Sequence, residues 1–465
     1  MSEDEKDDLR GLRLSVHALL IVLSLASAAG RIGAVEARDG RTPFLSANDR
    51  SRWCTVRALV ELGTYEIDEV IRDRGWDSID KVQHVGRDGE VHFYSSKPPL
   101  LATLVAVPCW MVHKVTGATL SEHPFYVGRA VLMLVQLPLM GLLLLCICWL
   151  VEQFGTTFWG RVFVVAVGCW GTFLTTMVAT FNNHLPAAAA VAVALCALVR
   201  LLPKHCEESD EDEDENTDDR GGGIASSVPY ALAGFFAAFA VTNDLPALSF
   251  FAAAGLICWF RNWSKTLLAF VPGASVVVAG FFLTNWLAHA DLRPPYMHRG
   301  EVDNWYDYEN SYWLVENRRG VDRGEPSRLI YALHSTIGHH GVLSLTPVWL
   351  LSIVGVGWML VDAKRRRLGW MILLLSLICM VFYIMRPLGD RNYGGVTCGF
   401  RWMYWFAPLW LAAMVPVADA MSRYRAWRVV AITLLVVSTL SAAYGLDNPW
   451  KHPWIYTYGE FMTWW

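Results

Sequence analysis

The sequence has little that would suit a soluble metalloenzyme or a transporter. Its ten cysteines include no CxxC pair, and most lie inside apolar runs, where cysteine packs as a small apolar residue. The apolar runs contain almost no charge and no internal repeat is present, whereas transporters commonly place charges at mid-membrane and repeat their halves. The amino-terminal MSEDEKDDLRGLR is acidic, which argues against a cleaved signal peptide. Only Cys54 and Cys398 fall in candidate external loops, so a disulfide between them is one interpretation.

Long apolar runs, by contrast, are abundant. Of the 465 residues, 54% are hydrophobic and 22 are tryptophan. Runs close to the roughly 20 residues that cross a hydrocarbon core recur throughout the chain. The chain is therefore predicted to be an all-α, multi-pass membrane protein. The apolar segments lie near 12–33, 98–112, 127–151, 161–181, 185–202, 227–243, 245–260, 266–288, 341–361, 369–386, 402–421 and 429–446.

Acidic charge is concentrated in one stretch. Ten acids lie between Glu207 and Asp219, and removing them would change the formal net charge from −4 to +6. A block of like charge that runs into three glycines cannot bury apolar surface. We therefore predict a disordered cytoplasmic loop over 203–226. A solvated linker is favoured there over a regulatory or cation-binding segment.

Basic residues predict the orientation. The segment 98–112 has about 15 apolar residues and three prolines, which is short for a span and suits a juxtamembrane or re-entrant helix. If it does not cross and the amino terminus is cytoplasmic, the later basic clusters all lie inside, as the positive-inside rule requires. About eleven spans follow. The inward clusters are Arg161, Arg200 with Lys204, Arg261 with Lys265, 364–367 and 422–428.

Several regions then face outward together. Residues 1–446 are predicted to form one integral membrane domain, and 447–465 an external segment rich in tryptophan and tyrosine, as suits a membrane interface. Two short turns, FNNHLP and VTNDLP, also face outward. The three longer outward regions are a first loop (34–126), a second loop (289–340) and residues 388–402.

The first loop contains an acid and a base near the membrane edge. Apolar residues recur at helical spacing from Asn48 to Leu62, and Gly63 supplies a stop, which predicts an amphipathic helix on the membrane surface. Asp49 lies in its first turn, where the helix dipole favours the ionised carboxylate. Asp49 could simply cap the helix, and Lys97, just before a double proline, could simply reach toward the interface. Both can also reach one membrane-edge cavity.

These residues resemble a known family. An Asp in an amphipathic helix after the first span, an Arg three residues on, and KPPLL some 45 residues later resemble the first periplasmic loop of polyprenyl-phosphate-sugar glycosyltransferases of the GT-C fold. Aminoarabinose (lipid A) transferases and protein O-mannosyltransferases are the most similar groups. The resemblance covers residues 45–105 well, 176–190 more weakly, and the rest only in architecture. It implies a GT-C-like bundle with juxtamembrane helices in the first external loop.

The resemblance also implies residue roles. Asp49 matches the family's catalytic acid. Arg52 matches the basic residue that accompanies it, and Lys97 matches the lysine before the double proline. The family often has a second Asp in the turn ATFNNHLPA, where this chain has Asn183 and His184. Relatives often have acids where this chain has Arg50 and Ser96, and both differences count against a divalent-metal role. A divalent metal is kept only as an alternative, and no metal ligand is assigned.

The implied reaction displaces a polyprenyl phosphate from the anomeric carbon of a sugar. An acceptor hydroxyl or amine needs a base, and the departing phosphate needs positive charge. We predict Asp49 as the base, Lys97 and Arg401 as the phosphate-side cations, and Arg52 as a further cation. Arg401 closes the glycine-rich NYGGVTCGFRW, although a tight turn with an interfacial arginine is an equally good interpretation.

Other polar residues at span edges complete the prediction. Asn183 and His184 are predicted to contact substrate, and Asp244 either contacts substrate or caps the next helix. His340, with His334 and His339, either binds donor phosphate or metal or lines a wet interface. The expected partners are the lipid-linked donor, a lipid, glycan or protein acceptor and membrane lipids, with no nucleic acid.

The competing hypotheses are a secondary transporter or lipid flippase, and a receptor or scaffold. Polar residues collected on one face favour an enzyme working at the outer leaflet over a transporter. A scaffold would not bring Asp49, Lys97 and His184 together. A bacterial inner membrane with the site facing the periplasm is the expected location, and an ER membrane would suit the same physics.

Overall fold

The computed structural model of the protein describes residues 3–202, 224–300 and 302–464. These residues are helical almost throughout, with one antiparallel hairpin formed by β1 (Lys81–Val85) and β2 (Val91–Ser95). The all-α prediction is confirmed. Most of the predicted acidic loop, 203–223, lies outside the described residues. Its last three residues correct the prediction, because α9 begins at Ile224 rather than near 227.

Ten helices in the described ranges are long and apolar enough to cross a membrane, and two more apolar helices are shorter. The shorter ones are α10 (Leu248–Arg261), preceded by η2 (Leu245–Ala247), and α15 (Trp349–Val361). The long ones are α1 (Glu3–Ala34), α4 (Pro99–Thr116), α5 (Pro124–Phe154), α6 (Phe158–Trp170) with α7 (Leu174–Met177), α8 (His184–Leu201), α9 (Ile224–Asn243), α11 (Trp263–Lys265) with η3 (Thr266–Phe270) and α12 (Val271–His289), α16 (Arg366–Ile384), η7 (Arg401–Phe406) with α17 (Ala407–Met421), and α18 (Arg425–Tyr444).

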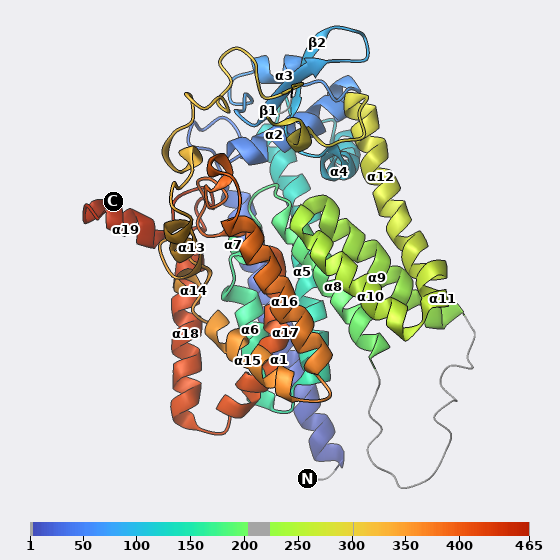
Figure 1. The fold of residues 1–465 in the computed structure, drawn as a ribbon, viewed down its shortest axis with the longest axis vertical. Coiled ribbons are helices and arrows are strands. Elements are labelled where there is room, and N and C mark those ends of the chain that lie inside the picture. The colour runs from blue at the N-terminus through green and yellow to red at the C-terminus, as the bar shows by residue number, and fades with distance from the viewer. Residues whose placement is uncertain (1–2, 203–223, 301, 465) are drawn as a thin grey trace.

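One long apolar helix, α4, does not run along the bundle. It lies at one end, at the height of α2 (Ala47–Arg57), while the spans follow the vertical axis (Figure 1), and it packs against α2, α5 and α12. The other nine long helices with α10 and α15 give eleven spans among the described residues, as predicted. α4 is the expected juxtamembrane helix, extended by a few residues.

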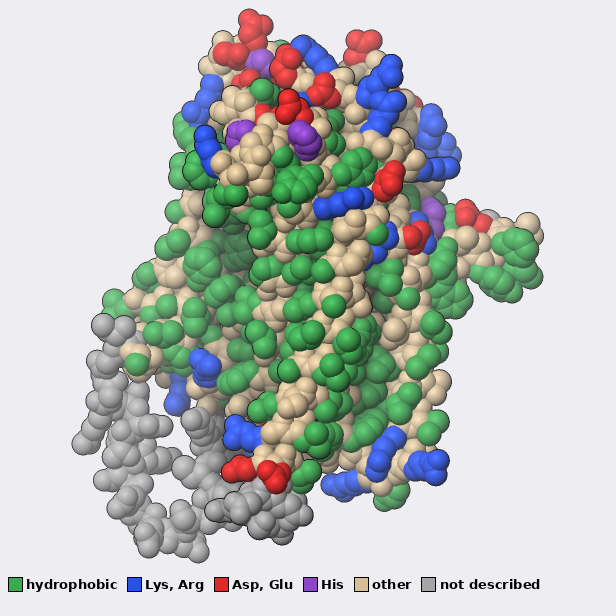
Figure 2. Space-filling model, turned by 180° about the vertical axis from the view of Figure 1, so that it is seen from behind, with side chains coloured by type: hydrophobic (Ala, Val, Ile, Leu, Met, Phe, Trp, Pro, Cys, Tyr) green, Lys and Arg blue, Asp and Glu red, His purple; other side chains and the backbone are tan. Residues whose placement is uncertain are grey.

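The non-spanning elements gather at the same end of the bundle, which we call the outer end, following the predicted orientation (Figure 1). Charged side chains collect at the two ends and leave a hydrophobic belt between them (Figure 2). This is the pattern that a bilayer requires. The remaining elements are α3 (Asp68–Arg72), η4 (Pro295–His298), η5 (Gly320–Arg323), α13 (Arg328–Thr336), α14 (Val342–Leu345), η6 (Leu388–Asp390) and α19 (Trp454–Phe461).

The predicted helix is present, but it is not an amphipathic helix exposed on the membrane surface, because eight of the eleven residues of α2 are buried. α2 continues into the π-helical turn η1 (Ala58–Leu62) and stops at Gly63, whose φ of 72° is the left-handed conformation that glycine adopts without strain. Its cap is Ser46, whose hydroxyl accepts from the Asp49 amide at 3.0 Å. Asp49 therefore lies in the first turn, and the N-cap residue itself is Ser46.

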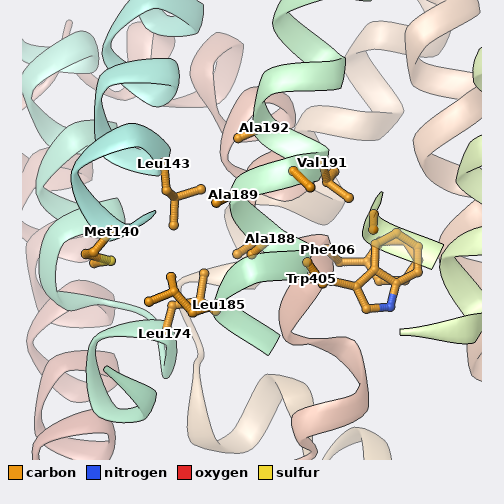
Figure 3. Close-up of a cluster of buried hydrophobic side chains, with 14 of the residues drawn as sticks. Met140, Leu143, Leu174, Leu185, Ala188, Ala189, Val191, Ala192, Trp405 and Phe406 are labelled. Carbon is orange, nitrogen blue, oxygen red and sulfur yellow. The ribbon is translucent and has the colours of Figure 1, made fainter. Parts of the chain in front are cut away.

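The core beneath the outer end is built on α8. Its small side chains, among them Ala188, Ala189 and Ala192, lie between Leu143 of α5 and the buried Trp405 of η7 (Figure 3). Small residues let membrane helices approach closely. The start of α8 is thereby held against α5, α9 and η7, which positions the turn that precedes it.

The suggested disulfide between Cys54 and Cys398 is not formed. Both cysteines are free and fully buried. The Cys54 thiol donates to the Trp76 carbonyl at 3.2 Å, and Cys398 lies 4.0 Å from the Tyr404 hydroxyl. They belong to different parts of the outer end and pack as the other cysteines do.

Candidate functional site

A cavity of about 530 Å³ lies at the outer end, between the first loop and the late loops. Its wall is unusually rich in charge for a membrane protein. A second cavity of about 720 Å³ shares part of this wall, including Tyr306 and Trp402, and reaches Asp244. The charged residues of the first cavity are Asp80, Lys97, Arg299, Asp322, Arg386, Asp390 and Arg401.

Lys97 lies in this cavity beside an acid that the sequence analysis did not identify. Its ammonium lies 2.9 Å from the Asp80 carboxylate. The hairpin brings the two together, because β1 starts just after Asp80 and β2 ends just before Ser96, whose amide donates to the Asp80 carbonyl at 3.1 Å. Pro98 and Pro99 then turn the chain into α4. Burial lowers the pKa of Lys97, and Asp80 acts in the opposite direction.

Five predicted site residues form one continuous chain of polar contacts. Arg52 donates to the Asn183 side-chain oxygen at 2.8 Å, and the Asn183 amide donates to Asp244 at 2.9 Å. The other oxygen of Asp244 lies 3.2 Å from Nδ1 of His184, whose Nε2 lies 3.1 Å from the Arg401 guanidinium. The chain joins α2, the turn before α8, the turn after α9 and η7. These five residues, each a predicted site residue, are therefore in contact with one another.

Arg401 is held from three sides. Besides His184, its Nε donates to the Gly394 carbonyl at 2.6 Å, and its guanidinium lies 5.1 Å from the centre of the Trp450 ring. Gly394 has a φ of 91°, and a Cβ there would lie 2.9 Å from Nε of Arg401. The glycine is thus required for this arginine, which faces the cavity with a fixed geometry.

Arg52 is buried but remains cationic. Burial and the nearby Arg401 lower its pKa to about 10, against the effect of Asp80. A group with this pKa is protonated at neutral pH. Arg52, Arg401 and Lys97 therefore place three positive charges around Asp80 and Asp244, and this excess of positive charge can stabilise an anion.

Asp49 does not line the cavity. Its side chain is fully buried, and its carboxylate oxygens accept from the backbone amides of Leu45 and Phe181, each at 3.0 Å. It links the start of α2 to the loop before α8. Burial raises the pKa of Asp49 to about 7, although the two amides and Arg52 act to lower it. An acid with this pKa can exchange a proton near neutral pH.

His340 belongs to a separate group of rings at the outer end. It stacks on Tyr393, with ring centres 4.7 Å apart, and contacts the ring of His339 through the two Nδ1 atoms. His452 and Tyr456 complete the group. Burial and the neighbouring histidines lower the pKa of His340, which keeps it neutral. The structure does not bring His340 into the chain from Arg52 to Arg401.

Among the described residues, one group could gather three ligand atoms around a metal ion, formed by Glu66, Asp88 and His92. It lies beside the hairpin and contains none of the predicted site residues. His92 is 2.9 Å from Asp88, and this hydrogen bond raises the pKa of His92. Five of the eight predicted site residues instead contact one another.

An apolar cavity of about 290 Å³ lies next to the polar site. It runs between α15 and α16, and Ile353 and Leu377 at its edge are 55% and 53% exposed. Trp349 and Trp410 separate it from a smaller hollow that is lined by Tyr404. The Tyr404 ring lies 6.0 Å from that of His184. The larger cavity thus opens toward the membrane-facing surface, and the smaller hollow extends to Tyr404 beside the polar chain.

No protein-family model and no curated protein sequence matches the chain. Several solved structures are similar, among them the following two. The oligosaccharyltransferase of Archaeoglobus fulgidus, tethered to an acceptor peptide, aligns with a TM-score of 0.50 and 11% identity over 96% of this chain and 57% of its own. ArnT from Cupriavidus metallidurans in the apo state aligns with a TM-score of 0.52 and 11% identity over 92% of this chain and 75% of its own. This chain thus spans little more than half of the archaeal enzyme. At such identity the likeness is one of fold.

Proposed function

The chain has the fold of the GT-C membrane glycosyltransferases, and we propose that it transfers a sugar from a polyprenyl-phosphate donor to a lipid, glycan or protein acceptor. The observation that carries the proposal is the outer cavity, in which Lys97 and Arg401 face the same space as Asp80. Cations and an acid in one buried cavity are what displacement of a phosphate by an acceptor requires. The proposed location is a bacterial inner membrane, with the cavity facing the periplasm.

In this proposal the donor phosphate lies between Lys97 and Arg401. Negative charge grows on the phosphate as the bond to the sugar breaks, so fixed cations stabilise the transition state more than the ground state. Arg401 supplies a planar pair of donors and Lys97 a compact charge. His184 contacts Arg401 directly and is itself held by the rest of the chain of contacts described above, which consists of Asp244, Asn183 and Arg52.

The apolar cavity between α15 and α16 supports a lipid-linked donor. Its exposed edge would allow a prenyl tail to enter from the bilayer, and the adjoining smaller hollow extends to Tyr404, whose ring lies 6.0 Å from that of His184. A nucleotide-sugar donor would have no use for such a route. The polar headgroup of the donor would then lie near Arg401 while its tail stays in an apolar environment.

Two carboxylates are candidates for the general base. Asp49 remains our proposal, because its pKa of about 7 matches a base that works near neutral pH. To act as the base, the Asp49 carboxylate must give up its hydrogen bond with one of the two backbone amides and bind the acceptor hydroxyl or amine instead. Asp80 is the alternative, because it already faces the cavity and needs only to share Lys97 with the substrate. For His340, contact with the donor stays a prediction.

The experiment is transfer of radiolabelled sugar from a panel of polyprenyl-phosphate donors to a membrane-extract acceptor pool. We expect transfer by the wild type and its loss in Lys97→Ala and Arg401→Ala. Arg72→Ala, which removes a cation from the exposed surface of the first loop, is the matched control and should keep full transfer. Absence of transfer by the wild type with every donor would favour the transporter or flippase hypothesis.

A further inference from the structure

A third large cavity lies at the opposite, inner end of the bundle. It measures about 660 Å³ and is bounded by the last turns of α8 and α10 and the first turns of α16. Eleven of its thirteen lining residues are apolar and the other two are Arg261 and Arg367. We call this cavity the inner groove. The apolar lining residues are Leu195, Leu198, Val199, Leu201, Leu202, Leu256, Ile257, Phe260, Leu368, Trp370 and Met371.

The inner groove is open to the bilayer. Phe260 is 83% exposed, Leu256 57% and Trp370 47%, although each of these side chains is apolar. Exposed apolar side chains on a spanning helix face lipid, and tryptophan near the end of a span is typical of the interface between hydrocarbon and headgroups. The groove therefore lies at the depth where an acyl chain meets its headgroup.

The two arginines of the inner groove are not neutralised by any described residue. Within the described part of the chain, neither Arg261 nor Arg367 makes a hydrogen bond or an ion pair. The next arginines along α16 do, because Arg365 donates to the Phe154 carbonyl at 2.9 Å and Arg366 to the Leu360 carbonyl at 3.0 Å. The two positive charges that line the groove are thus the ones left for a ligand.

We propose that the inner groove binds an anionic phospholipid of the inner leaflet. The acyl chains lie against the leucines of α8 and α10, and the phosphate lies at Arg261 and Arg367. An apolar wall with two cations at its interfacial rim matches an amphiphile with a negative headgroup, and basic pockets between helices at this depth suit such lipids. The proposal requires only the membrane orientation and is independent of the proposed transfer activity.

The acidic stretch of the chain is the rival occupant. It begins five residues after Leu202, and its charges complement the same arginines. However, Glu207–Asp219 contains no apolar residue, so it could satisfy the two arginines but not the eleven apolar residues around them. A phospholipid satisfies both parts of the groove.

The test measures lipid binding to the full-length protein in micelles, by native mass spectrometry and by the thermal unfolding midpoint. The probes are phosphatidylglycerol and, as the zwitterionic comparison, phosphatidylcholine. We expect phosphatidylglycerol to bind more tightly and to raise the midpoint further. The double variant Arg261→Gln/Arg367→Gln should bind phosphatidylglycerol roughly 30-fold more weakly, since each basic residue near a headgroup contributes on the order of 1 kcal/mol.

The matched control is Arg423→Gln/Arg425→Gln, which removes two exposed arginines from the same end of the bundle but outside the inner groove. It should bind phosphatidylglycerol as the wild type does. Equal loss in both double variants would mean general attraction to the basic end and would overturn the site. Equal binding of the two lipids by the wild type would overturn it as well.

A third variant separates the lipid from the acidic stretch. In it, the ten acids of 207–219 are replaced by Asn and Gln. We expect phosphatidylglycerol binding to change by less than twofold. A tenfold increase that disappears when Arg261 and Arg367 are also replaced would assign these arginines to the acidic stretch and overturn the proposal.

Discussion

The outer cavity and the inner groove both contain arginines, but they use them differently. At the outer end Arg401 and Arg52 are held by His184, Asn183 and the Gly394 carbonyl, in a chain that leaves little freedom. At the inner end Arg261 and Arg367 lie in an apolar groove and have no such partners among the described residues. Arginines that are fixed by hydrogen bonds suit catalysis, because they need no reorganisation as negative charge develops in the transition state. Arginines without such hydrogen bonds suit the binding of a ligand that does not react.

Several measurements can break or sharpen this comparison. The largest effect is expected from the cations of the outer cavity. Lys97→Ala and Arg401→Ala should each lower kcat/KM for sugar transfer by roughly 100- to 1000-fold, the usual result of removing a fixed charge from a developing anion. Steady-state kinetics with a polyprenyl-phosphate donor would measure it. A change confined to KM would show that the charge only binds the donor and that the chemistry lies elsewhere.

The second largest effect concerns the base. Replacing the carboxylate that takes the acceptor proton should lower kcat by roughly 100-fold or more. Asp49→Asn and Asp80→Asn are to be compared under identical conditions, with the thermal unfolding midpoint as a check on folding. Loss of sugar transfer in Asp49→Asn alone would identify Asp49 as the base. Loss in Asp80→Asn alone would make Asp49 a structural link between α2 and the loop before α8.

The pH profile adds a readout that folding does not mimic. If Asp49 is the base, kcat should rise about tenfold per pH unit toward pH 7 and then level off, because only the ionised form accepts a proton. The free energy of unfolding should change in the opposite direction and fall as the pH rises. The folded state holds this proton up to about pH 7 while the unfolded chain releases it near pH 4, so stability is lost as the pH rises between these values.

The stability change from Asp49 should total roughly 4 kcal/mol between pH 4 and above pH 7, at 1.4 kcal/mol for each unit of pKa. Asp49→Asn should remove this slope, which equilibrium unfolding at several pH values would measure. An unchanged slope in the variant would mean that Asp49 titrates normally in the folded protein, and Asp80 would then be the better candidate for the base.

A smaller effect is expected at Asn183. Its side chain joins Arg52 to Asp244, so Asn183→Ala leaves buried polar groups without this partner. Such a loss costs about 1–3 kcal/mol of stability. The unfolding midpoint should fall, and transfer should fall with it because Asp244, which contacts His184 beside Arg401, loses a hydrogen bond. Unchanged stability would show that water replaces the amide and that the chain of contacts is not required.

The smallest effect is expected at the inner end. Arg261→Gln/Arg367→Gln should change transfer by less than twofold in phosphatidylcholine membranes, because the inner groove is remote from the outer cavity. The same assay as for Lys97→Ala measures it. A loss of transfer comparable to that of Lys97→Ala would abolish the distinction between the two cavities and would require the groove to act on the reaction.

Much of the outer site was visible in the sequence. His184 and Asp244 are predicted because they are polar residues at the edges of apolar spans on one predicted side. Arg52 comes from the family resemblance, and Arg401 from the glycine-rich segment that it closes. Asp80 was missed. It stands in an ordinary polar loop, and only the register of the hairpin, with Lys81 opposite Ser95, places it beside Lys97. A sequence search for short strands around the KPP motif is the signal that could have found it.

The number of spans and the juxtamembrane position of α4 follow from hydropathy and basic residues alone, because a bilayer imposes its thickness and charge asymmetry on any chain that crosses it. The orientation of the spans stays a prediction from the basic residues. What surrounds each carboxylate does not follow from these rules. Asp49 and Asp80 are both acids of the first loop, yet one lies beneath two backbone amides and the other faces the cavity with Lys97. That difference was decided by the tertiary structure, because it depends on contacts between residues up to 132 positions apart in the chain.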